Sequence, residues 1–219
     1  LSLVGSEMCI RDRYKRICVK KFPSLKRKHF LCMMEAEKIQ SGKAQSLQIT
    51  ERHGEDMNII VTVDENWAIG KGGDFLTRIP AEQRNTDSLT LGKTIIMGRK
   101  TLQALPQGQP LYGRENIILT QDAQFAQKGV TVAHSVEELE ELLAEKEQES
   151  IFVYGGESVF KALLPKCDTA YVLYIEKSYD ANRFFENLDR SEGWELTEES
   201  DEQTYFDITY YFRKYERKA

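Results

Sequence analysis

An apolar run that leads directly into a basic turn constrains the fold of this chain most strongly. Residues 94–101 read Thr-Ile-Ile-Met-Gly-Arg-Lys-Thr, and a helical-looking segment continues to residue 105. A buried strand that ends in glycine and opens onto a helix presents free backbone N–H groups and a positive dipole end, and Arg99 and Lys100 add two cations. Two interpretations fit this pattern: a phosphate-binding turn for a nucleotide, or a strand followed by a solvated basic turn.

A second stretch repeats this arrangement. Residues 151–158 read Ile-Phe-Val-Tyr-Gly-Gly-Glu-Ser, which is again a strand, then glycines, then a helix that Pro165 stops. Gly155 and Gly156 would let the backbone approach a pyrophosphate closely, but they do not form the Gly-x-Gly-x-x-Gly fingerprint. The sequence therefore predicts a second nucleotide-binding turn without a standard Rossmann domain.

The remaining elements alternate as in an α/β domain. Strands are predicted at residues 57–63, 94–97, 116–120, 129–133, 151–154, 169–175, 194–198 and 205–215. Helices are predicted to begin at Pro80, Thr101, Ser135 (a capping box with Glu138, running to about Lys146) and Ser158. This order predicts an α/β fold with a doubly wound, mostly parallel sheet and a C-terminal antiparallel hairpin.

Two features between the first strand and the second suggest a binding site. Residues 67–74 combine three glycines with an apolar triplet, which predicts a loop able to close over a ligand. Trp67 and Ile69 weaken the alternative of a plain surface loop, because both side chains favour burial. Glu82 follows Pro80 in the first turn of a predicted helix, where the dipole favours a carboxylate. It is interpreted either as a solvent-facing carboxylate or as one positioned in a pocket.

Composition changes sharply at Met57. Residues 1–56 carry 12 Lys and Arg against 7 Asp and Glu, whereas the remainder carries 18 against 28. Three of the four cysteines also precede Met57, and Cys167 alone follows it. A single cysteine argues against a disulfide framework and for a reducing compartment, which predicts a cytoplasmic protein. No run approaches the roughly 18 apolar residues of a membrane span, so no membrane partner is expected.

The first residues match a laboratory sequence. Residues 3–13 read Leu-Val-Gly-Ser-Glu-Met-Cys-Ile-Arg-Asp-Arg, as in the translation of a transposase adaptor used in sequencing libraries. We therefore expect residues 1–56 to be an artefactual or disordered extension, with the domain at residues 57–219. The basic tract at residues 20–28 would otherwise suggest a nucleic-acid arm or a transit sequence. Resequencing across codon 57 tests this hypothesis, and an uninterrupted genomic reading frame through codon 1 would contradict it.

Residues 57–219 resemble a bacterial dihydrofolate reductase along their whole length. The resemblance is carried by residues 68–70 (Ala-Ile-Gly), 79–82 (Ile-Pro-Ala-Glu), 96–101 (Ile-Met-Gly-Arg-Lys-Thr), 114–119 (Arg-Glu-Asn-Ile-Ile-Leu), the Gly155-Gly156 pair and the Tyr-rich last strand. It implies NADPH-dependent reduction of 7,8-dihydrofolate to 5,6,7,8-tetrahydrofolate, by hydride transfer from the nicotinamide to C6 with protonation of N5. It also implies a role in one-carbon metabolism, a monomer, small-molecule partners alone and no metal.

The same resemblance assigns roles to individual residues. Glu82, the catalytic residue, would hydrogen-bond the 2-amino group and N3 of the pterin, while an ordered water protonates N5. Arg114 would bind the α-carboxylate of the substrate's glutamate in a bidentate pair, and Arg99 would favour the 2′-phosphate of NADPH. The implied substrate-binding residues are Ile60, Glu82, Thr86, Leu111, Arg114 and Tyr154. The implied cofactor-binding residues are Thr62, Ile69, Gly70, Gly98, Arg99, Lys100, Thr101, Thr120, Gln121, Gly155, Gly156, Glu157 and Ser158.

Several positions depart from the family pattern. The departures are Thr62 for alanine, Thr86 for an aromatic residue, Tyr154 for a smaller aliphatic, Leu173 for the threonine that hydrogen-bonds the acid, Asn182 for aspartate, and a missing Trp near residues 76–77. Loss of a buried hydrogen-bond partner of Glu82 would cost about 1–3 kcal/mol. We therefore expect slow turnover or a different substrate.

Two alternatives remain open at this point. One is a paralogue on the same fold that reduces another pterin or a pyrimidine of riboflavin synthesis. Arg114 favours folate, because the riboflavin precursor has no glutamate tail, whereas Thr86 and Leu173 favour the paralogue. The other alternative is a nucleotide-binding protein without catalysis, which would bind NADPH and show no substrate-dependent oxidation.

Overall fold

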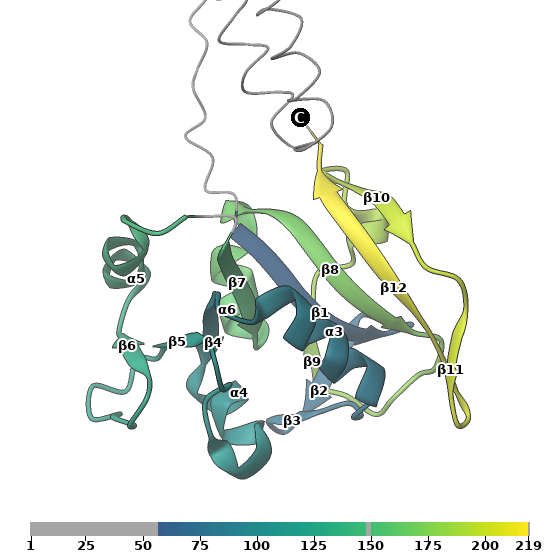
Figure 1. The fold of residues 1–219 in the computed structure, drawn as a ribbon. Helices are drawn as coiled ribbons and strands as arrows, with labels where there is room; N and C mark the ends of the chain where they lie inside the picture. Colours follow the sequence, from purple (N-terminus) through teal and green to yellow (C-terminus); the bar gives the residue numbers. More distant parts are fainter. Residues whose placement is uncertain (1–56, 148–149, 219) are drawn as a thin grey trace, which may run out of the picture. The chain divides into compact units, whose positions relative to one another are not determined.

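The computed structural model describes residues 57–147 and 150–218, so the extension predicted at residues 1–56 lies outside the described part. Within it, a nine-stranded sheet has the order β10-β12-β8-β1-β7-β4-β5-β6, with β11 paired to β12 (Figure 1). Its strands are β1 (Met57–Asp64), β4 (Thr94–Gly98), β5 (Glu115–Leu119), β6 (Thr131–Ala133), β7 (Ile151–Gly155), β8 (Cys167–Ile175), β10 (Trp194–Glu199), β11 (Gln203–Tyr205) and β12 (Ile208–Arg217). Strands β1 and β4 to β8 pair in parallel, while β12 is antiparallel to β8 and β10. The predicted fold class is confirmed.

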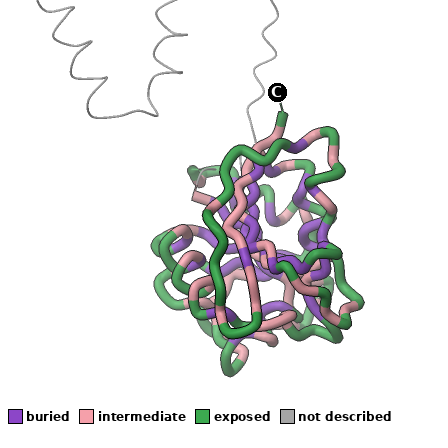
Figure 2. The backbone as a smooth tube through the Cα atoms, turned by 90° about the vertical axis from the view of Figure 1, so that its right-hand side faces the viewer, coloured by how far each residue is buried: buried purple, intermediate pink, exposed green. Residues whose placement is uncertain are grey.

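Helices cover both faces of the sheet. They are α3 (Pro80–Thr90), α4 (Arg99–Ala104), α5 (Val136–Leu143) and α6 (Glu157–Leu163), with short 3-10 turns η2 (Pro106–Gly108), η4 (Leu164–Lys166) and η5 (Leu188–Arg190). Adjacent residues of β4 point to opposite faces, so Ile96 packs in the core that includes α5 and α6, whereas Ile95 packs with Leu102 of α4. The buried segments run through the middle of the domain (Figure 2). No helix among the described residues is long and apolar enough to cross a bilayer.

Several predicted boundaries are wrong, and the largest error lies near the C-terminus. Residues 205–215 do not form one strand, because the chain turns at Phe206 (φ 53°) and β11 folds back onto β12. Helices α4 and α6 start immediately after their glycine turns, earlier than predicted, and α5 ends early, at Leu143. The predicted cap of α5 is present, since the Ser135 hydroxyl accepts the Glu138 N–H at 3.1 Å.

The segment predicted as a glycine-rich loop contains two short strands. Strands β2 (Ala68–Lys71), β3 (Asp74–Phe75) and β9 (Arg183–Phe184) form a separate antiparallel sheet. A Cβ atom on Gly70 would lie 2.2 Å from the backbone oxygen of Asp74, so only glycine permits this close hairpin. The side-chain oxygen of Asn182 accepts the Gly72 N–H at 3.1 Å and ties the hairpin to the segment before β9. A plain loop is therefore the wrong description.

Trp67 anchors this small sheet to the main core. Its side chain is buried, and its ring centroid lies 6.2 Å from that of Phe185 and 5.9 Å from that of Tyr215. Its backbone adopts a φ of 60°, which is uncommon for a residue other than glycine and persists only where packing holds it. The prediction that Trp67 is covered is confirmed.

Candidate active site

A cleft of about 1190 Å³ lies at the carboxyl ends of β1, β4, β5 and β7. Its walls also include residues of α3, α4, α6 and the small sheet β3-β2-β9. Open α/β sheets bind ligands at this edge. All the residues predicted to bind substrate or cofactor line the cleft except Arg114 and Gly155.

One end of the cleft is built from backbone. The N-cap residues of α4 and α6 are Gly98 and Gly156, and neither helix start has a side-chain hydrogen bond to its first turn. The first turns of both helices line the same cleft, and their backbone N–H groups have no partner within the helix. Arg99 adds a cation whose Nη1 lies 3.4 Å from Asp122 Oδ2, and Lys100 lines the same wall. This donor set fits the phosphates of a dinucleotide.

The two adjacent glycines of this end serve different purposes. Gly155 has a φ of 103°, and a Cβ atom there would lie 2.5 Å from Cε2 of Phe160 on α6. Packing against α6 therefore requires glycine at position 155. Gly156, joined to it by a cis peptide bond, lines the cleft, and a Cβ atom there would meet the Thr101 hydroxyl at 3.3 Å.

The other end of the cleft centres on Glu82 in the first turn of α3. Burial raises the pKa of Glu82 to about 7, while a hydrogen bond from Thr62 and the charge of Arg78 lower it, and the charge of Asp87 raises it. Thr62 is therefore a polar neighbour of Glu82, although position 173 carries a leucine. Thr62 of β1 lies in register with Leu173 of β8, so the hydroxyl comes from the neighbouring strand.

The phenol of Tyr154 forms a neutral wall near Glu82. Burial first, and then the charge of Glu82, raises the pKa of Tyr154 well above its usual range. Its ring makes an edge contact with Phe75 of β3, with centroids 6.2 Å apart. The aromatic residue that position 86 lacks in α3 is thus partly offset by aromatic rings from β7 and the small sheet. Thr86 itself is buried in the cleft wall.

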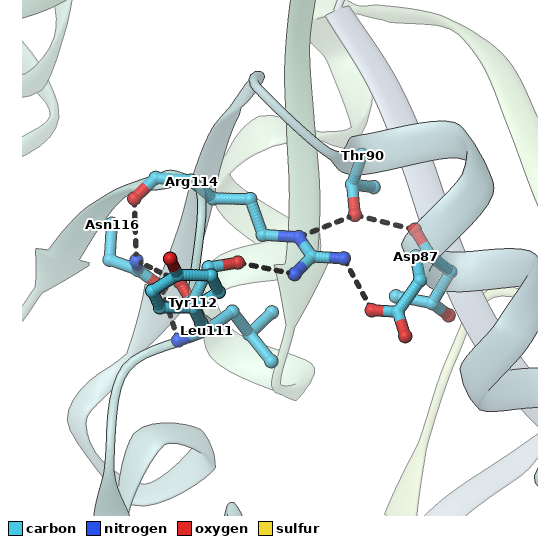
Figure 3. Close-up of polar contacts among 7 residues, drawn as sticks. Asp87, Thr90, Leu111, Tyr112, Arg114 and Asn116 are labelled. Atoms are coloured by element: carbon cyan, nitrogen blue, oxygen red, sulfur yellow. Dashed lines mark hydrogen bonds and ion pairs between the residues drawn. The ribbon is translucent and has the colours of Figure 1, made fainter.

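Arg114 occupies a cluster of internal acceptors (Figure 3). Its Nε donates to Thr90 Oγ1 at 2.9 Å, its Nη1 to the carbonyl oxygen of Tyr112 at 2.6 Å, and its Nη2 to Asp87 Oδ1 at 2.5 Å. The Arg114 side chain is only 5% exposed, whereas that of Asp87 is 52% exposed and lines the cleft. The guanidinium thus lies behind the cleft wall.

The cleft is also lined by charged or titratable residues that the sequence does not single out, and four of them lie close to the predicted site residues. They are Arg78, Asp87, His134 and Arg183. His134 Nδ1 lies 3.1 Å from the carbonyl oxygen of Thr120, and Arg183 Nη1 lies 3.2 Å from Glu157 Oε2. Asp87 had a weak signal, because it shares a short helix with Glu82. Arg183 had none, since β9 reaches the cleft only through pairing with β2.

The chain is similar to known dihydrofolate reductases in both sequence and fold. Residues 56–217 match the family profile described as "Dihydrofolate reductase". The dihydrofolate reductase of Staphylococcus haemolyticus is 35% identical over 164 residues, which cover 74% of this chain and 95% of the relative. The dihydrofolate reductase of Staphylococcus aureus is 31% identical over 140 residues, which cover 64% of this chain and 83% of that relative. The structure of the Enterococcus faecalis dihydrofolate reductase complexed with NADP(H) and RAB-propyl superposes with a TM-score of 0.67 at 28% identity, covering 75% of this chain and 98% of that chain.

Proposed function

We propose that this chain, which belongs to the dihydrofolate reductase family, reduces 7,8-dihydrofolate to 5,6,7,8-tetrahydrofolate with NADPH. One observation carries the proposal: a half-buried carboxyl group, Glu82, lines the same cleft as two uncapped helix starts and the cations Arg99 and Lys100. A pterin has donors that match a carboxylate, and a dinucleotide has phosphates that match the other end. When bound, NADPH supplies the hydride, and the protein supplies orientation and electrostatics.

At the pterin end, Glu82 orients the substrate. Its carboxylate accepts hydrogen bonds from the 2-amino group and N3, and these donors lower the pKa of Glu82 from about 7. Thr62 holds the carboxyl group in place, and Ile60, Thr86, Leu111 and Tyr154 pack around the ring system. The proton that reaches N5 comes from an ordered water, because Glu82 binds the opposite side of the pterin.

At the nucleotide end, the chain binds NADPH mainly through backbone. Gly98 to Thr101, Gly156, Glu157 and Ser158 surround the phosphates, with Gly155 supporting them from behind. Thr120 and Gln121 contact the adenosine, and Thr62, Ile69 and Gly70 lie on the nicotinamide side. Arg99 binds the 2′-phosphate in a charge-assisted contact.

The proposal extends to the setting of the enzyme. The partners are the two small molecules, with no nucleic acid and no membrane. The protein acts as a monomer in the cytoplasm, and the free thiol of buried Cys167 supports a reducing compartment.

The test is NADPH oxidation by the full chain with and without dihydrofolate, followed by the absorbance of the reduced nicotinamide. Glu82→Gln is expected to lower kcat/KM for dihydrofolate by about a hundredfold or more while leaving NADPH binding intact. Glu82→Asp keeps a carboxylate and is expected to retain most of the activity. NADPH binding without dihydrofolate-dependent oxidation in the unmodified chain would instead favour a non-catalytic nucleotide-binding protein.

A further inference from the structure

The cluster around Arg114 contains a carboxylate at the place where the proposed substrate would bring its own (Figure 3). Two acceptors of the guanidinium are neutral: the Thr90 hydroxyl and the Tyr112 carbonyl oxygen. The third, Asp87 Oδ1, is charged and lies 2.5 Å from Nη2. Thr90 is itself fixed, because its hydroxyl donates to the Thr86 carbonyl oxygen at 2.5 Å. The charge of Arg114 is therefore already balanced by a residue of α3.

A count of donors shows what this leaves for a ligand. A guanidinium has five N–H groups in a planar fork, and a bidentate carboxylate uses two of them. Three of those of Arg114 are committed to residues of the described chain. A substrate carboxylate would thus share one cation with Asp87, and the two anions would repel one another. Like charges brought together at a binding site select against a ligand.

The charge of Asp87 also acts on the rest of the pterin end. The charge of Asp87 raises the pKa of Glu82. The pKa of Tyr154 is raised mainly by burial, and the next largest influences on it are the charges of four groups, which are, from largest to smallest, Glu82, Arg114, Asp87 and Arg78. These four groups therefore lie close to one another at the pterin end, with Arg114 behind the cleft wall. Arg78 is a second cation there, with its Nη2 donating to the Ala104 carbonyl oxygen at 3.3 Å. Asp87, together with Glu82 when it is ionised, offsets the two cations and weakens the positive field that would attract an anionic tail.

We propose that Asp87 is a specificity-determining residue that occupies Arg114 as an internal counter-ion and weakens binding of substrates with a carboxylate tail. This inference rests on the proposed reductase function and refines its substrate class. The enzyme discriminates little between dihydrofolate and dihydropterins whose side chain carries no carboxylate. Removal of the charge at position 87 restores a preference for the tailed substrate.

The experiment compares the unmodified full chain with Asp87→Asn and Asp74→Asn. Asp74 lines the same cleft from β3 but takes no part in the hydrogen bonds or ion pairs of Arg114, so its variant controls for net charge alone. KM is measured at saturating NADPH for 7,8-dihydrofolate and for 6-methyl-7,8-dihydropterin. We expect Asp87→Asn to lower KM for dihydrofolate by about fivefold or more, with KM for the tailless pterin within about twofold. Asp74→Asn should leave the ratio of the two KM values unchanged.

The corresponding ratio of dissociation constants is measured without turnover by calorimetric titration with folic acid and 6-methylpterin. This measurement separates the inference from the reductase function. If neither dihydropterin supports NADPH oxidation, the proposed function fails, and the calorimetric ratio still decides the role of Asp87. An unchanged ratio in Asp87→Asn, or an equal change in Asp74→Asn, would overturn the inference, as would a failure of both pterins to bind. Thermal unfolding of each variant confirms that the fold is intact.

Discussion

The two ends of the cleft are built in different ways. The nucleotide end uses backbone N–H groups and glycines from short continuous stretches, each of which joins a strand to a helix. The pterin end uses side chains from segments that lie far apart in the sequence. Thr62 of β1 reaches Glu82 of α3, and Asp87 of α3 reaches Arg114. The first end depends on chain geometry, and the second depends on individual side chains.

This difference has an electrostatic consequence. The carboxylate at the nucleotide end, Glu157, has its pKa lowered by its hydrogen bond to Lys161 and then by Arg183. The carboxyl at the pterin end, Glu82, has its pKa raised by burial. The nucleotide end therefore keeps its carboxylate charged and paired, whereas the pterin end holds a carboxyl group that changes charge near neutral pH. The pterin end should be the more sensitive of the two to pH and to substitution.

The largest expected effect is on stability. The pKa of Glu82 is raised from 4.5 to about 7, so the ligand-free protein binds a proton more tightly than the unfolded chain. The contribution of this proton to the free energy of unfolding is fully present below pH 4.5 and is lost as pH rises to about 7. It amounts to at most about 3 kcal/mol. Urea unfolding between these limits should show the loss in the unmodified chain and not in Glu82→Gln.

Glu157→Gln is the matched control for this prediction. The pKa of Glu157 is lowered, so its contribution to stability is present above its ordinary pKa and is lost only as the pH falls below it. The variant should keep the loss of stability between pH 4.5 and about 7 that belongs to Glu82. If both variants flatten the pH dependence equally, the contrast between the two ends is wrong.

The next effect concerns the choice of cofactor. Arg99→Gln removes a cation from the nucleotide end and should raise KM for NADPH by about 10- to 100-fold, the worth of a charge-assisted contact, without changing KM for NADH. Arg78→Gln removes a cation from the pterin end and should leave the ratio of the two KM values unchanged. An equal rise in KM for NADPH and NADH in Arg99→Gln would show that Arg99 does not bind the 2′-phosphate.

The contrast also explains what the sequence could reveal. Residues 94–101 correctly predicted a strand that leads through Gly98 into a helix, because both elements are encoded by consecutive residues, although the helix begins at Arg99 and not at Thr101. Residues 67–74 were mistaken for a loop because their partner strand β9 lies near position 183. Gly155 was explained by approach to a pyrophosphate, whereas its φ and its contact with Phe160 appear only in three dimensions. Local patterns are therefore readable, and long-range pairings are not.

The pterin end illustrates the same limit at the level of single side chains. Leu173 alone suggested that Glu82 had lost its hydrogen-bond partner. The register of β1 against β8 sets Thr62 beside Leu173, so the hydroxyl is present on the adjacent strand. Likewise, Arg114 predicted a site for a substrate carboxylate, but the internal carboxylate that reaches it comes from α3. Each departure can be interpreted only together with its spatial neighbour.

The smallest predicted effect tests whether the Thr62 hydroxyl replaces a hydroxyl at position 173 as the hydrogen-bond partner of Glu82. Thr62→Ala removes a hydrogen bond that lowers the pKa of Glu82, so the pKa should rise above about 7. The kcat/KM for dihydrofolate should fall by about tenfold, the usual worth of one such bond, and its pH profile should move to higher pH. Thr62→Ser retains the hydroxyl and should behave like the unmodified chain.

The decisive variant is the double substitution Thr62→Ala with Leu173→Thr. Because the two positions lie side by side on paired parallel strands, a hydroxyl restored at position 173 should recover both kcat/KM and the pH profile. A double variant no better than Thr62→Ala would show that the two strands are not interchangeable sources of the bond. If Thr62→Ala instead raises KM for NADPH and leaves the pH profile unmoved, Thr62 belongs to the nucleotide end. The pterin end would then include no side chain of β1 that hydrogen-bonds Glu82.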